Sequence, residues 1–465
     1  MNFLDKIEGY NSNICLIDEN KKTLFYKDVL KTSEKITKNL KERSLIFVLA
    51  HNHTEFVTSY IGFFKKGLVQ VLLNENIDIN QLKNLIKSYL PKYIFLPSSR
   101  IRDFKNYDVI ANLNKHKILI LNKKKSYSMN KDLALLLNTS GSTGSKKFVR
   151  ISYENIYDNT KNIVKYLNIN QKHKTITTMP PFYTYGLSII NTHLYSGASI
   201  VVTNLRVVEK AFWRLLHDQQ VTSFGGVPYF YEMIKKLDFS KISLPNLKYL
   251  TQAGGPLSEG LTKYFLNYAE THNISFIVMY GQVEATSRIT YLPPNMSRKK
   301  IGSIGVPLFG GKIYLKSDKS GDDEKGEIVY EGKNVSMGYA NNFKDLNKGD
   351  ENCGILNTGD LAIKDKDGYL YITGRKSRNV KLFGHRVNLD ELEQILSKKG
   401  YNCLCYGFDN KVTIFHVNKN YNSLVLKNLS EITDIHLSCF KLKYIKKFPL
   451  NDIGKVSHIK LEKLL

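Results

Sequence analysis

The stretch Ser44-Leu-Ile-Phe-Val-Leu-Ala50 is a short apolar run bounded by polar residues, which is typical of a buried strand. Helical patterns follow it at Glu55 to Lys66 and at Ile79 to Tyr89. Four other runs repeat the strand signal: Leu68–Leu73, Tyr93–Leu96, Lys117–Leu121 and Ser199–Thr203. Strands that alternate with helices in this way predict an α/β fold with largely parallel sheets flanked by helices.

The bulk composition indicates a globular protein. The chain has 465 residues, of which 42% are hydrophobic and 24% are charged, and this length suits two or three packed units. No charged segment followed by an apolar one opens the chain, and no apolar run approaches the roughly 20 residues that cross a bilayer. We therefore expect a cytoplasmic protein without a membrane span.

The texture of the sequence changes in its last third. From about Lys312, short alternating strands and turns such as Lys364-Asp-Lys-Asp-Gly368 predict a β-rich region. Beyond Arg375, a helix is expected to begin near its cap residue Asn388. The predicted domains are a large N-terminal domain at 1–374, which includes a β-rich subdomain at about 312–374, and a small α+β domain at 375–465.

Charge and cysteine usage narrow the function classes. The formal net charge is +26, but the lysines are spread along the whole chain. Diffuse lysine is typical of solvated surface, so we expect no nucleic-acid partner, whereas an acidic protein partner stays open. The five cysteines lack paired C-x-x-C spacing, so neither a disulfide framework nor a zinc site is predicted. Cys403 and Cys405 alternate along an apolar stretch and are expected to be small core residues of a strand.

The segment Thr139-Ser-Gly-Ser-Thr-Gly-Ser-Lys-Lys147 has the composition of a phosphate-binding loop. Its glycines let the backbone approach phosphate oxygens, its hydroxyls donate hydrogen bonds and its lysines supply positive charge. No Ser or Thr follows Lys146, so the Walker pattern is not met. The segment is therefore either a different phosphate loop or a solvated linker. The binding candidates are Thr139, Ser140, Gly141, Ser142 and Gly144, and Thr143 and Lys147 are the catalytic candidates of this segment.

Further motifs follow this loop in order along the chain. They are Tyr280-Gly-Gln-Val-Glu284, Thr358-Gly-Asp360, Gly374-Arg375, Lys381-Leu-Phe-Gly-His-Arg386 and Gly454-Lys455. Together with the loop, from about Leu24 to Lys455, they resemble the adenylate-forming superfamily of acyl-CoA synthetases, aryl-CoA ligases, luciferases and peptide-synthetase adenylation domains. The resemblance implies a stand-alone ligase that activates a carboxylate with ATP and magnesium as an acyl-adenylate, and it implies that the C-terminal domain is a mobile lid.

The resemblance also implies roles for single residues. The loop would hold the β- and γ-phosphates, although Lys146 and Phe148 replace the usual proline and glycine. Glu284 would bind magnesium, for which a carboxylate oxygen is a suitable hard ligand. The usual threonine before it is Val283 here, and Thr286 or a loop serine is expected to compensate. The remaining residues expected to bind ATP or AMP are Gly254, Gly255, Tyr280, Gly281, Gln282, Asp360 and Arg375, the last two through the ribose.

Lid rotation is implied about Ser377, the position of the family's hinge. In one state Lys455 would reach the α-phosphate and the attacking carboxylate as a catalytic residue. In the other state the segment with Gly384 and Arg386 would line the path of the thiol, and the missing side chain of Gly384 would let a narrow pantetheine pass.

The acid pocket is expected at Tyr183, Thr184, Tyr185, Gly225 and Gln252. Tyr183 stands where peptide-synthetase domains have an aspartate that pairs with an α-ammonium group, which disfavours an ordinary α-amino acid. Tyr183 and Tyr185 have a structural alternative as core aromatics.

The leading hypothesis is an AMP-forming acid–thiol ligase that acts on a small carboxylic acid. CoA or a phosphopantetheine arm would be the acceptor, and an acidic acyl carrier protein is the partner that the positive charge suggests. Two alternatives stand: adenylation followed by amide or ester formation on a sugar precursor, and a non-catalytic scaffold that binds nucleotide or nucleic acid.

Overall fold

The computed structural model describes residues 3–121, 127–138, 147–317, 324–382, 385–408, 410–421, 425–427, 429, 436–451 and 454–465. The chain divides into two compact units. The first contains Met1–Ile301, Pro307–Lys312 and Glu331–Leu356, and the second contains Gly302–Val306, Ile313–Tyr330 and Asn357–Leu465. Two parts of the β-rich segment, Ile313–Tyr330 and the part from Asn357 onward, are thus grouped with the C-terminal residues, while the domain boundary at 374 stays a prediction.

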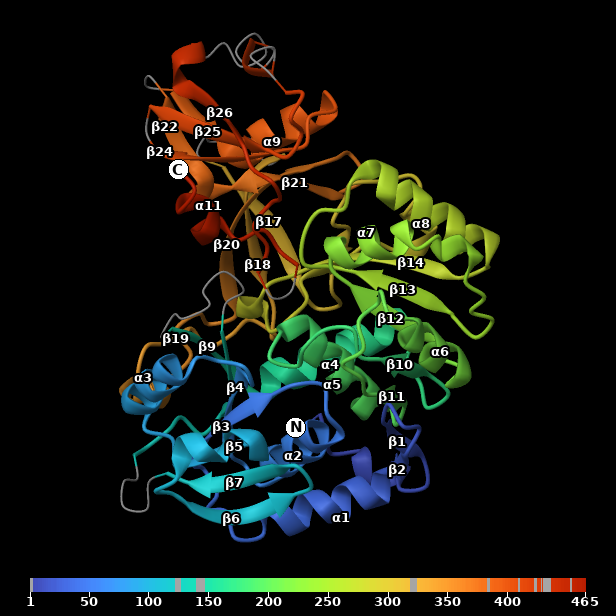
Figure 1. The fold of residues 1–465 in the computed structure, drawn as a ribbon, viewed down its shortest axis with the longest axis vertical. Coiled ribbons are helices and arrows are strands. Elements are labelled where there is room, and N and C mark those ends of the chain that lie inside the picture. Colours follow the sequence, from blue (N-terminus) through green and yellow to red (C-terminus); the bar gives the residue numbers. More distant parts are fainter. Residues whose placement is uncertain are drawn as a thin grey trace. The chain divides into compact units, whose positions relative to one another are not determined.

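Two large sheets form the framework of the first unit (Figure 1). An eight-stranded sheet has the order β19-β9-β8-β4-β3-β5-β7-β6. Its strands β8, β4, β3 and β5 run parallel to one another, and the flanking strands pair antiparallel. The bounds are β3 Leu45–Ala50, β4 Val69–Asn74, β5 Tyr93–Pro97, β6 Asp108–Leu113, β7 His116–Ile120, β8 Leu133–Asn138, β9 Phe148–Ser152 and β19 Tyr339–Ala340.

The second sheet has nine strands in the order β16-β15-β14-β13-β12-β10-β11-β1-β2. Its centre, from β14 to β1, is parallel throughout. The bounds are β1 Ile14–Ile17, β2 Thr23–Phe25, β10 Lys174–Ile176, β11 Ser199–Val201, β12 Ser223–Gly226, β13 Tyr249–Gln252, β14 Ser275–Tyr280, β15 Thr290–Tyr291 and β16 Val306–Pro307. The parallel centres of both sheets confirm the predicted α/β class.

Helices cover the faces of both sheets. Buried side chains of α1, α2, α4 and α5 share one core with β3 and β4, and α4 and α5 also pack against β13 and β14. The outer face of the nine-stranded sheet is covered by α6, α7 and α8, as Figure 1 shows. The bounds are α1 Tyr26–Thr37, α2 Thr54–Lys65, α3 Ile79–Tyr89, α4 Tyr153–Leu167, α5 Thr184–Tyr195, α6 Lys210–Asp218, α7 Pro228–Lys236 and α8 Glu259–Thr271.

Local capping explains where several of these helices begin. The Ser152 hydroxyl accepts a hydrogen bond from the Asn155 amide, and the Asn155 side chain bonds the Ser152 amide in return. Asp78 caps α3 by accepting from the amides of Asn80 and Gln81. Such side chains satisfy amides that have no partner within the helix.

The second unit contains three smaller sheets, with the orders β17-β18-β20-β21, β22-β23 and β24-β25-β26. The bounds are β17 Lys312–Lys316, β18 Lys325–Glu331, β20 Ile355–Lys364, β21 Leu370–Arg375, β22 Asn379–Leu382, β23 His385–Asn388, α9 Leu389–Lys398, β24 Cys403–Phe408, β25 Lys411–His416, β26 Phe440–Tyr444 and α11 His458–Glu462. Asn388 caps α9 as predicted, and Asp365 closes the hairpin between β20 and β21.

Short 3-10 helices fill several connections. They are η1 Ile7–Tyr10, η2 Ser98–Phe104, η3 Phe239–Lys241, η4 Val283–Ala285, η5 Pro294–Met296, η6 Phe343–Asn347, η7 Lys376–Arg378 and η8 Leu437–Cys439.

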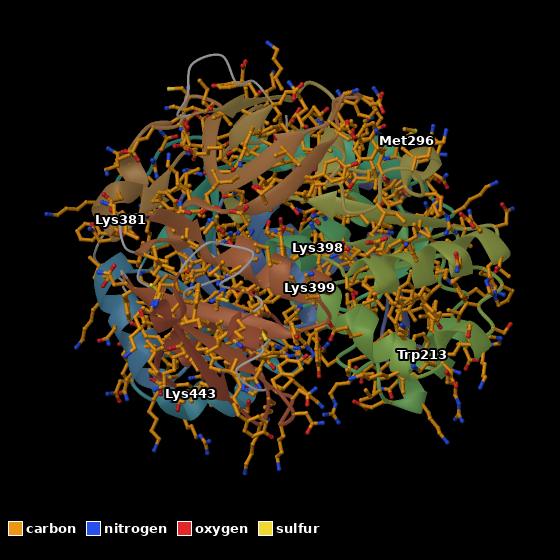
Figure 2. The ribbon with its side chains drawn as sticks, turned by 90° about the horizontal axis from the view of Figure 1, so that it is seen from above. Trp213, Met296, Lys381, Lys398, Lys399 and Lys443 are labelled. Atoms are coloured by element: carbon orange, nitrogen blue, oxygen red, sulfur yellow. The ribbon has the colours of Figure 1, made fainter. Side chains whose placement is uncertain are left out.

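Two predictions from composition can be compared with the structure. Cys403 and Cys405 are both buried on β24 in the core of the C-terminal part, as expected for small core residues. Figure 2 shows nitrogen-tipped side chains extending outward around the visible outline, and the labelled Lys381, Lys398 and Lys399 are exposed. Among the described residues, no helix combines the length and the apolar character that crossing a membrane needs.

Candidate active site

The turn after β14 is tightly folded. The Tyr280-Gly-Gln-Val-Glu284 segment leaves the strand, passes through η4 and returns, so that Gly281 lies against the backbone of Ser287 and Arg288. A Cβ atom at Gly281 would overlap the Ser287 carbonyl oxygen. Only glycine permits this approach, which explains why the predicted nucleotide segment has glycine at this position. The Gln282 amide group donates to the Tyr280 hydroxyl at 3.4 Å.

Glu284 and Lys147 share one aromatic residue. The Tyr339 hydroxyl donates a hydrogen bond of 2.9 Å to Glu284 Oε1, and the Lys147 ammonium lies 3.6 Å from the centroid of the Tyr339 ring. Burial and the neighbouring Glu284 carboxylate raise the pKa of Tyr339, so its hydroxyl stays a donor. The structure therefore places the Glu284 carboxylate and the Lys147 ammonium, which are far apart in the sequence, beside the same tyrosine.

The predicted phosphate loop connects β8 to β9. Thr139, Ser140, Gly141, Ser142, Thr143 and Gly144 lie outside the described residues, whereas Lys147 lies within them. Thr286 was expected to compensate for Val283. Its hydroxyl instead donates to the Asn334 carbonyl oxygen at 2.7 Å, and the residue is buried. The single hydroxyl proton of Thr286 is thus already used within the fold.

The residues predicted for the acid pocket gather at α5 and β12. Tyr183 is the residue that precedes α5, without a capping hydrogen bond from its side chain, and Thr184 begins the helix and donates to the Thr286 carbonyl oxygen. Tyr185 is buried, and its hydroxyl donates to the Thr251 carbonyl oxygen at 2.9 Å. Gly225 faces this hydroxyl, because a Cβ atom there would overlap it. Burial raises the pKa of Tyr185, which keeps the hydroxyl protonated.

Three other predicted residues follow β13. Gln252 is buried at the end of the strand, and its amide donates to the Gly255 carbonyl oxygen at 2.8 Å. Gly254 has a φ of +89°, which a residue with a side chain rarely adopts. A Cβ atom at Gly255 would lie 3.2 Å from Pro228 Cγ. The turn therefore stays close to the start of α7.

The predicted ribose pair lies in the second unit. Asp360 on β20 is buried and accepts a hydrogen bond of 2.8 Å from Arg375 Nε on β21. The two residues are direct partners across these antiparallel strands. Their side chains are thus preorganised as a pair, and the Arg375 side chain is 62% exposed.

The predicted hinge and lid residues also belong to the second unit. Ser377 is exposed in η7. On either side of it, the Arg375 backbone amide and the Arg378 side chain both donate to the Asp390 carboxylate on α9. Gly384 lies outside the described residues. The Arg386 backbone pairs with Lys381 in the β22–β23 hairpin. Burial and the nearby Arg375 lower the pKa of Lys455 to about 8.

Sequence reasoning missed three residues near these positions. Tyr339 lies on β19, far along the chain from its contacts Lys147 and Glu284, and it belongs to none of the motifs found in the sequence. Arg150 on β9 and Arg288 after η4 are both buried. The available signal for Arg288 was its position as the one charged residue in the segment from Ala285 to Leu292.

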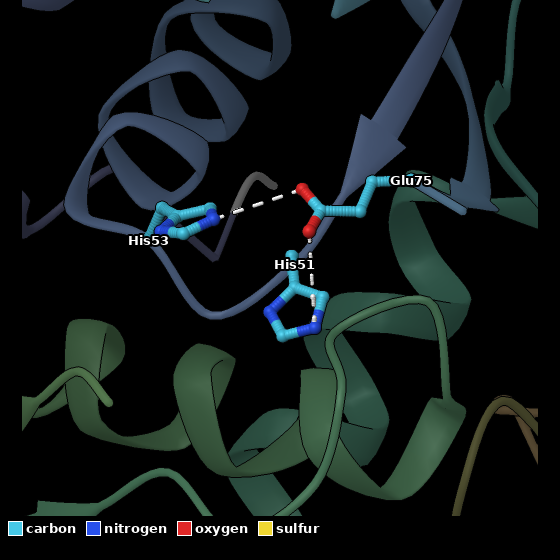
Figure 3. A group of neighbouring side chains, drawn as sticks. All are labelled: His51, His53 and Glu75. Carbon is cyan, nitrogen blue, oxygen red and sulfur yellow. Dashed lines mark ion pairs between the residues drawn. The ribbon is translucent and has the colours of Figure 1, made fainter. Parts of the chain in front are cut away.

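A separate group of potential metal ligands lies after β3 and β4 (Figure 3). The Glu75 carboxylate lies 3.9 Å from His51 Nε2 and 3.6 Å from His53 Nε2. The Asn52 amide donates to His51 Nδ1, so the proton of a neutral His51 ring is on Nε2, facing Glu75. A metal ion would need that nitrogen without its proton. Glu75 raises the pKa of His53. We therefore interpret His51, His53 and Glu75 as an ion-paired cluster and not as a metal site.

Comparisons with known proteins bear on the family. The model of the AMP-binding enzyme family matches residues 3–340. A 2-succinylbenzoate–CoA ligase from Oceanobacillus iheyensis is 28% identical over 358 residues, which cover 76% of this chain and 72% of that protein. Probable 4-coumarate–CoA ligase 2 from Dictyostelium discoideum is 26% identical over 404 residues, which cover 77% of this chain and 72% of that protein.

Solved structures share the fold at lower identity. The o-succinylbenzoate CoA synthetase of Bacillus subtilis, in complex with its acyl-adenylate intermediate, has a TM-score of 0.78 and 21% identity, and the match covers 99% of this chain and 98% of that chain. ATP-bound MatB from Rhodopseudomonas palustris has a TM-score of 0.81 and 18% identity, with 100% and 99% covered.

The family match spans most of the chain. The two relatives above are named as acid–CoA ligases, and each match covers more than two thirds of the relative's length. The leading hypothesis from the sequence is thereby confirmed at the level of reaction class. The chain belongs to the AMP-binding enzyme family and is an AMP-forming acid–thiol ligase, which uses ATP to convert a carboxylic acid into an acyl-adenylate and transfers the acyl group to a thiol.

Proposed function

We propose that the acceptor thiol is that of CoA and that the acid is a small carboxylic acid activated at the turn after β14. In the first half-reaction an oxygen of the acid forms a bond to the α-phosphorus of ATP, and pyrophosphate leaves. In the second, the thiol sulfur forms a bond to the acyl carbon, AMP leaves and the thiol proton is released. Both relatives described above are named for CoA as acceptor.

The observation that carries this proposal is the grouping of Glu284, Tyr339 and Lys147. One oxygen of Glu284 is oriented by the Tyr339 hydroxyl, and the other would serve as the hard ligand that magnesium prefers. Magnesium bound there would neutralise charge on the phosphates, and the Lys147 ammonium beside the same ring would add a second positive charge.

The residues of the second unit complete the proposal. Asp360 and Arg375 are proposed to bind the ribose hydroxyls, since a carboxylate accepts from two adjacent hydroxyls. Lys455 is proposed to stabilise charge on the α-phosphate, and Ser377 to act as the hinge. The cytoplasmic location expected from the sequence also belongs to this proposal.

The test is carboxylate-dependent exchange of labelled pyrophosphate into ATP, across a panel that includes 2-succinylbenzoate, 4-coumarate, and fatty, hydroxy and amino acids. Exchange with a non-amino acid, followed by thioester formation with CoA, is the expected result. Tyr339→Phe keeps the ring and removes one hydrogen bond to a charged group, so it should lower exchange on the order of 10-fold or more and raise the magnesium requirement. Tyr107→Phe, at an exposed tyrosine, is the matched control.

Other outcomes of the same experiment have definite meanings. Exchange without any CoA thioester, but with an acyl group on an acidic acyl carrier protein or a sugar amine, would replace CoA as acceptor. Silence with every acid, combined with salt-sensitive nucleic-acid binding, would favour the scaffold alternative.

A further inference from the structure

A buried arginine lines a cavity of the first unit, beside the residues predicted for the acid pocket. Arg288 is only 3% exposed. The cavity lies between α4, α5 and the strands β10, β12, β13 and β14, and the described residues that line it include no aspartate or glutamate. Its hydroxyl-bearing residues include Tyr185, Ser188, Thr192, Ser223, Tyr249 and Thr251.

The polar contacts of the Arg288 guanidinium are few and weak. Arg288 Nη2 lies 3.4 Å from the Ser188 hydroxyl oxygen, a long hydrogen bond. The guanidinium carbon lies 4.6 Å from the centroid of the Tyr185 ring, and the Tyr166 hydroxyl is a further neighbour. Nε has no hydrogen-bond partner although it is buried. Within the described part of the chain, the contacts of the guanidinium with Ser188, Tyr185 and Tyr166 are therefore all to neutral groups.

Arg150, a second buried arginine among the described residues, gives an internal comparison. Arg150 Nη2 pairs with the Glu351 carboxylate at 2.7 Å and also donates to the Met337 carbonyl oxygen. Its Nη1 and Nε donate to carbonyl oxygens of the segment that contains Tyr339 and Lys348. Every nitrogen of Arg150 is satisfied, as expected of an arginine that serves the fold. Arg288 lacks both the carboxylate and the full set of acceptors.

A buried cation without a counter-ion is costly, because neutral contacts do not replace the water that it has lost. An anionic ligand would remove that cost, and a guanidinium can hold a carboxylate through two hydrogen bonds. Arg288 also adjoins the turn that carries Glu284, since its Cα lies against Gly281. Its side chain contacts Tyr185, a residue predicted to line the acid pocket.

We propose that Arg288 binds a second carboxylate of the acid substrate, so that the enzyme activates a dicarboxylic acid at one end while the cavity holds the other end. This inference rests on the proposed function, because it names the class of acid that the same site takes. The surrounding hydroxyls supply the remaining hydrogen bonds to the distal carboxylate, and the neutral His193 at the cavity adds no competing charge.

The first test compares dicarboxylic acids with their monomethyl esters in the pyrophosphate exchange assay. The wild-type enzyme should prefer the diacid. Arg288→Gln should lower kcat/KM for the diacid by about 10²-fold to 10³-fold, the effect of leaving one buried charge of a pair alone, and should change it little for the monoester. Arg288→Lys should recover part of the loss. Arg298→Gln, at an exposed arginine paired with Glu270, should behave as wild type.

The possible failures are distinguishable. Wild-type exchange that favours monocarboxylic acids, or equal loss for diacid and monoester in Arg288→Gln, would overturn the inference and leave the proposed function standing. If no acid supports exchange, the proposed function fails. The inference is then decided by thermal unfolding, in which diacids should raise the Tm of the wild type and not of Arg288→Gln.

The second test separates a ligand-binding arginine from a structural one without using activity. Arg288→Met removes an uncompensated charge, so the Tm of the unliganded protein should stay within about 2 °C of wild type or rise. Arg150→Met breaks a complete network and should lower the Tm by about 5 °C or more. A fall for Arg288→Met as large as that for Arg150→Met would contradict the proposal.

Discussion

At the scale of single residues, the lowered pKa of Lys455 can be tested by enzyme kinetics. Burial and the charge of Arg375 lower its pKa to about 8. A lysine with this pKa carries its positive charge below pH 8 and loses it above. If Lys455 stabilises charge at the α-phosphate, the rate of adenylation should fall as Lys455 loses its proton.

We predict that kcat/KM for adenylation falls above about pH 8 in the wild type, and that Lys455→Arg removes this fall because an arginine keeps its charge. Lys455→Ala should lower adenylation on the order of 10²-fold to 10³-fold and leave thioester formation from supplied acyl-adenylate largely intact. The checks are pyrophosphate exchange from pH 6.5 to 9.5 and a separate thioester assay. Equal loss in both half-reactions would remove Lys455 from its proposed role.

At the scale of elements, the turn from Tyr280 to Arg288 brings the nucleotide segment and the cavity together through Gly281. Gly281→Ala would place a Cβ atom against the Ser287 carbonyl oxygen, and backbone at such a contact cannot move without shifting the whole turn. Both Glu284 and Arg288 would move with it.

We therefore predict that Gly281→Ala lowers kcat/KM in the exchange assay on the order of 10²-fold, the effect expected from misplacing reacting groups by about 1 Å. Gly260→Ala is the matched control, because Gly260 lies in α8 with nothing within 4 Å of an added Cβ atom. It should keep full activity and gain up to about 1 kcal/mol of stability. Normal activity in Gly281→Ala would show that the turn adapts.

Much of the element pattern could be predicted from the sequence because it is set locally. The helix expected at Ile79 to Tyr89 has these bounds, since Asp78 caps it. The apolar runs became strands because burial of both sheet faces demands continuous apolar residues. Pairing direction is not local: β7 proved antiparallel to β5, which no pattern within Lys117–Leu121 indicates.

For the candidate site too, local sequence motifs were predictable and contacts between distant segments were not. Motifs identified Lys147 and Glu284, yet they did not reveal Tyr339, whose contacts to both depend on the pairing of β19 with β9. Thr286 or a loop serine was expected to compensate for Val283, and the Thr286 hydroxyl donates instead to the Asn334 carbonyl oxygen. Contacts between distant segments are decided by tertiary packing, which a single sequence does not display.

At the scale of the whole molecule, buried histidines couple stability to pH. Burial lowers the pKa of both His116 and His193 to about 4, and the two residues are 4% and 2% exposed. A histidine with a lowered folded pKa stabilises the fold above its unfolded pKa of about 6.5 and loses that contribution as the pH falls toward 4. His53, whose pKa is raised by Glu75, acts in the opposite sense, losing its contribution as the pH rises.

We predict that the free energy of unfolding decreases between pH 7 and pH 5.5, with each buried histidine contributing about 1 kcal/mol. His116→Phe keeps the stacking on Phe95, whose ring is 5.0 Å away, and should lose about 1 kcal/mol less than wild type over this interval. Urea denaturation at the two pH values measures the difference, and exposed His217→Gln is the control. An unchanged pH dependence in His116→Phe would mean that the ring takes up a proton in the folded state.

The interleaving of the two units governs how this protein can be made. The first unit resumes at Glu331–Leu356 after the chain has already entered the second unit, and that late segment supplies β19 and the acceptors of Arg150. A nascent chain that has left the ribosome only as far as Ile301 therefore has an unpaired β9 edge and lacks the groups that pair with Arg150. Such an edge invites pairing with other chains. A gene cut at this apparent boundary yields an aggregation-prone fragment, and the smallest expressible piece of the first unit extends past residue 356.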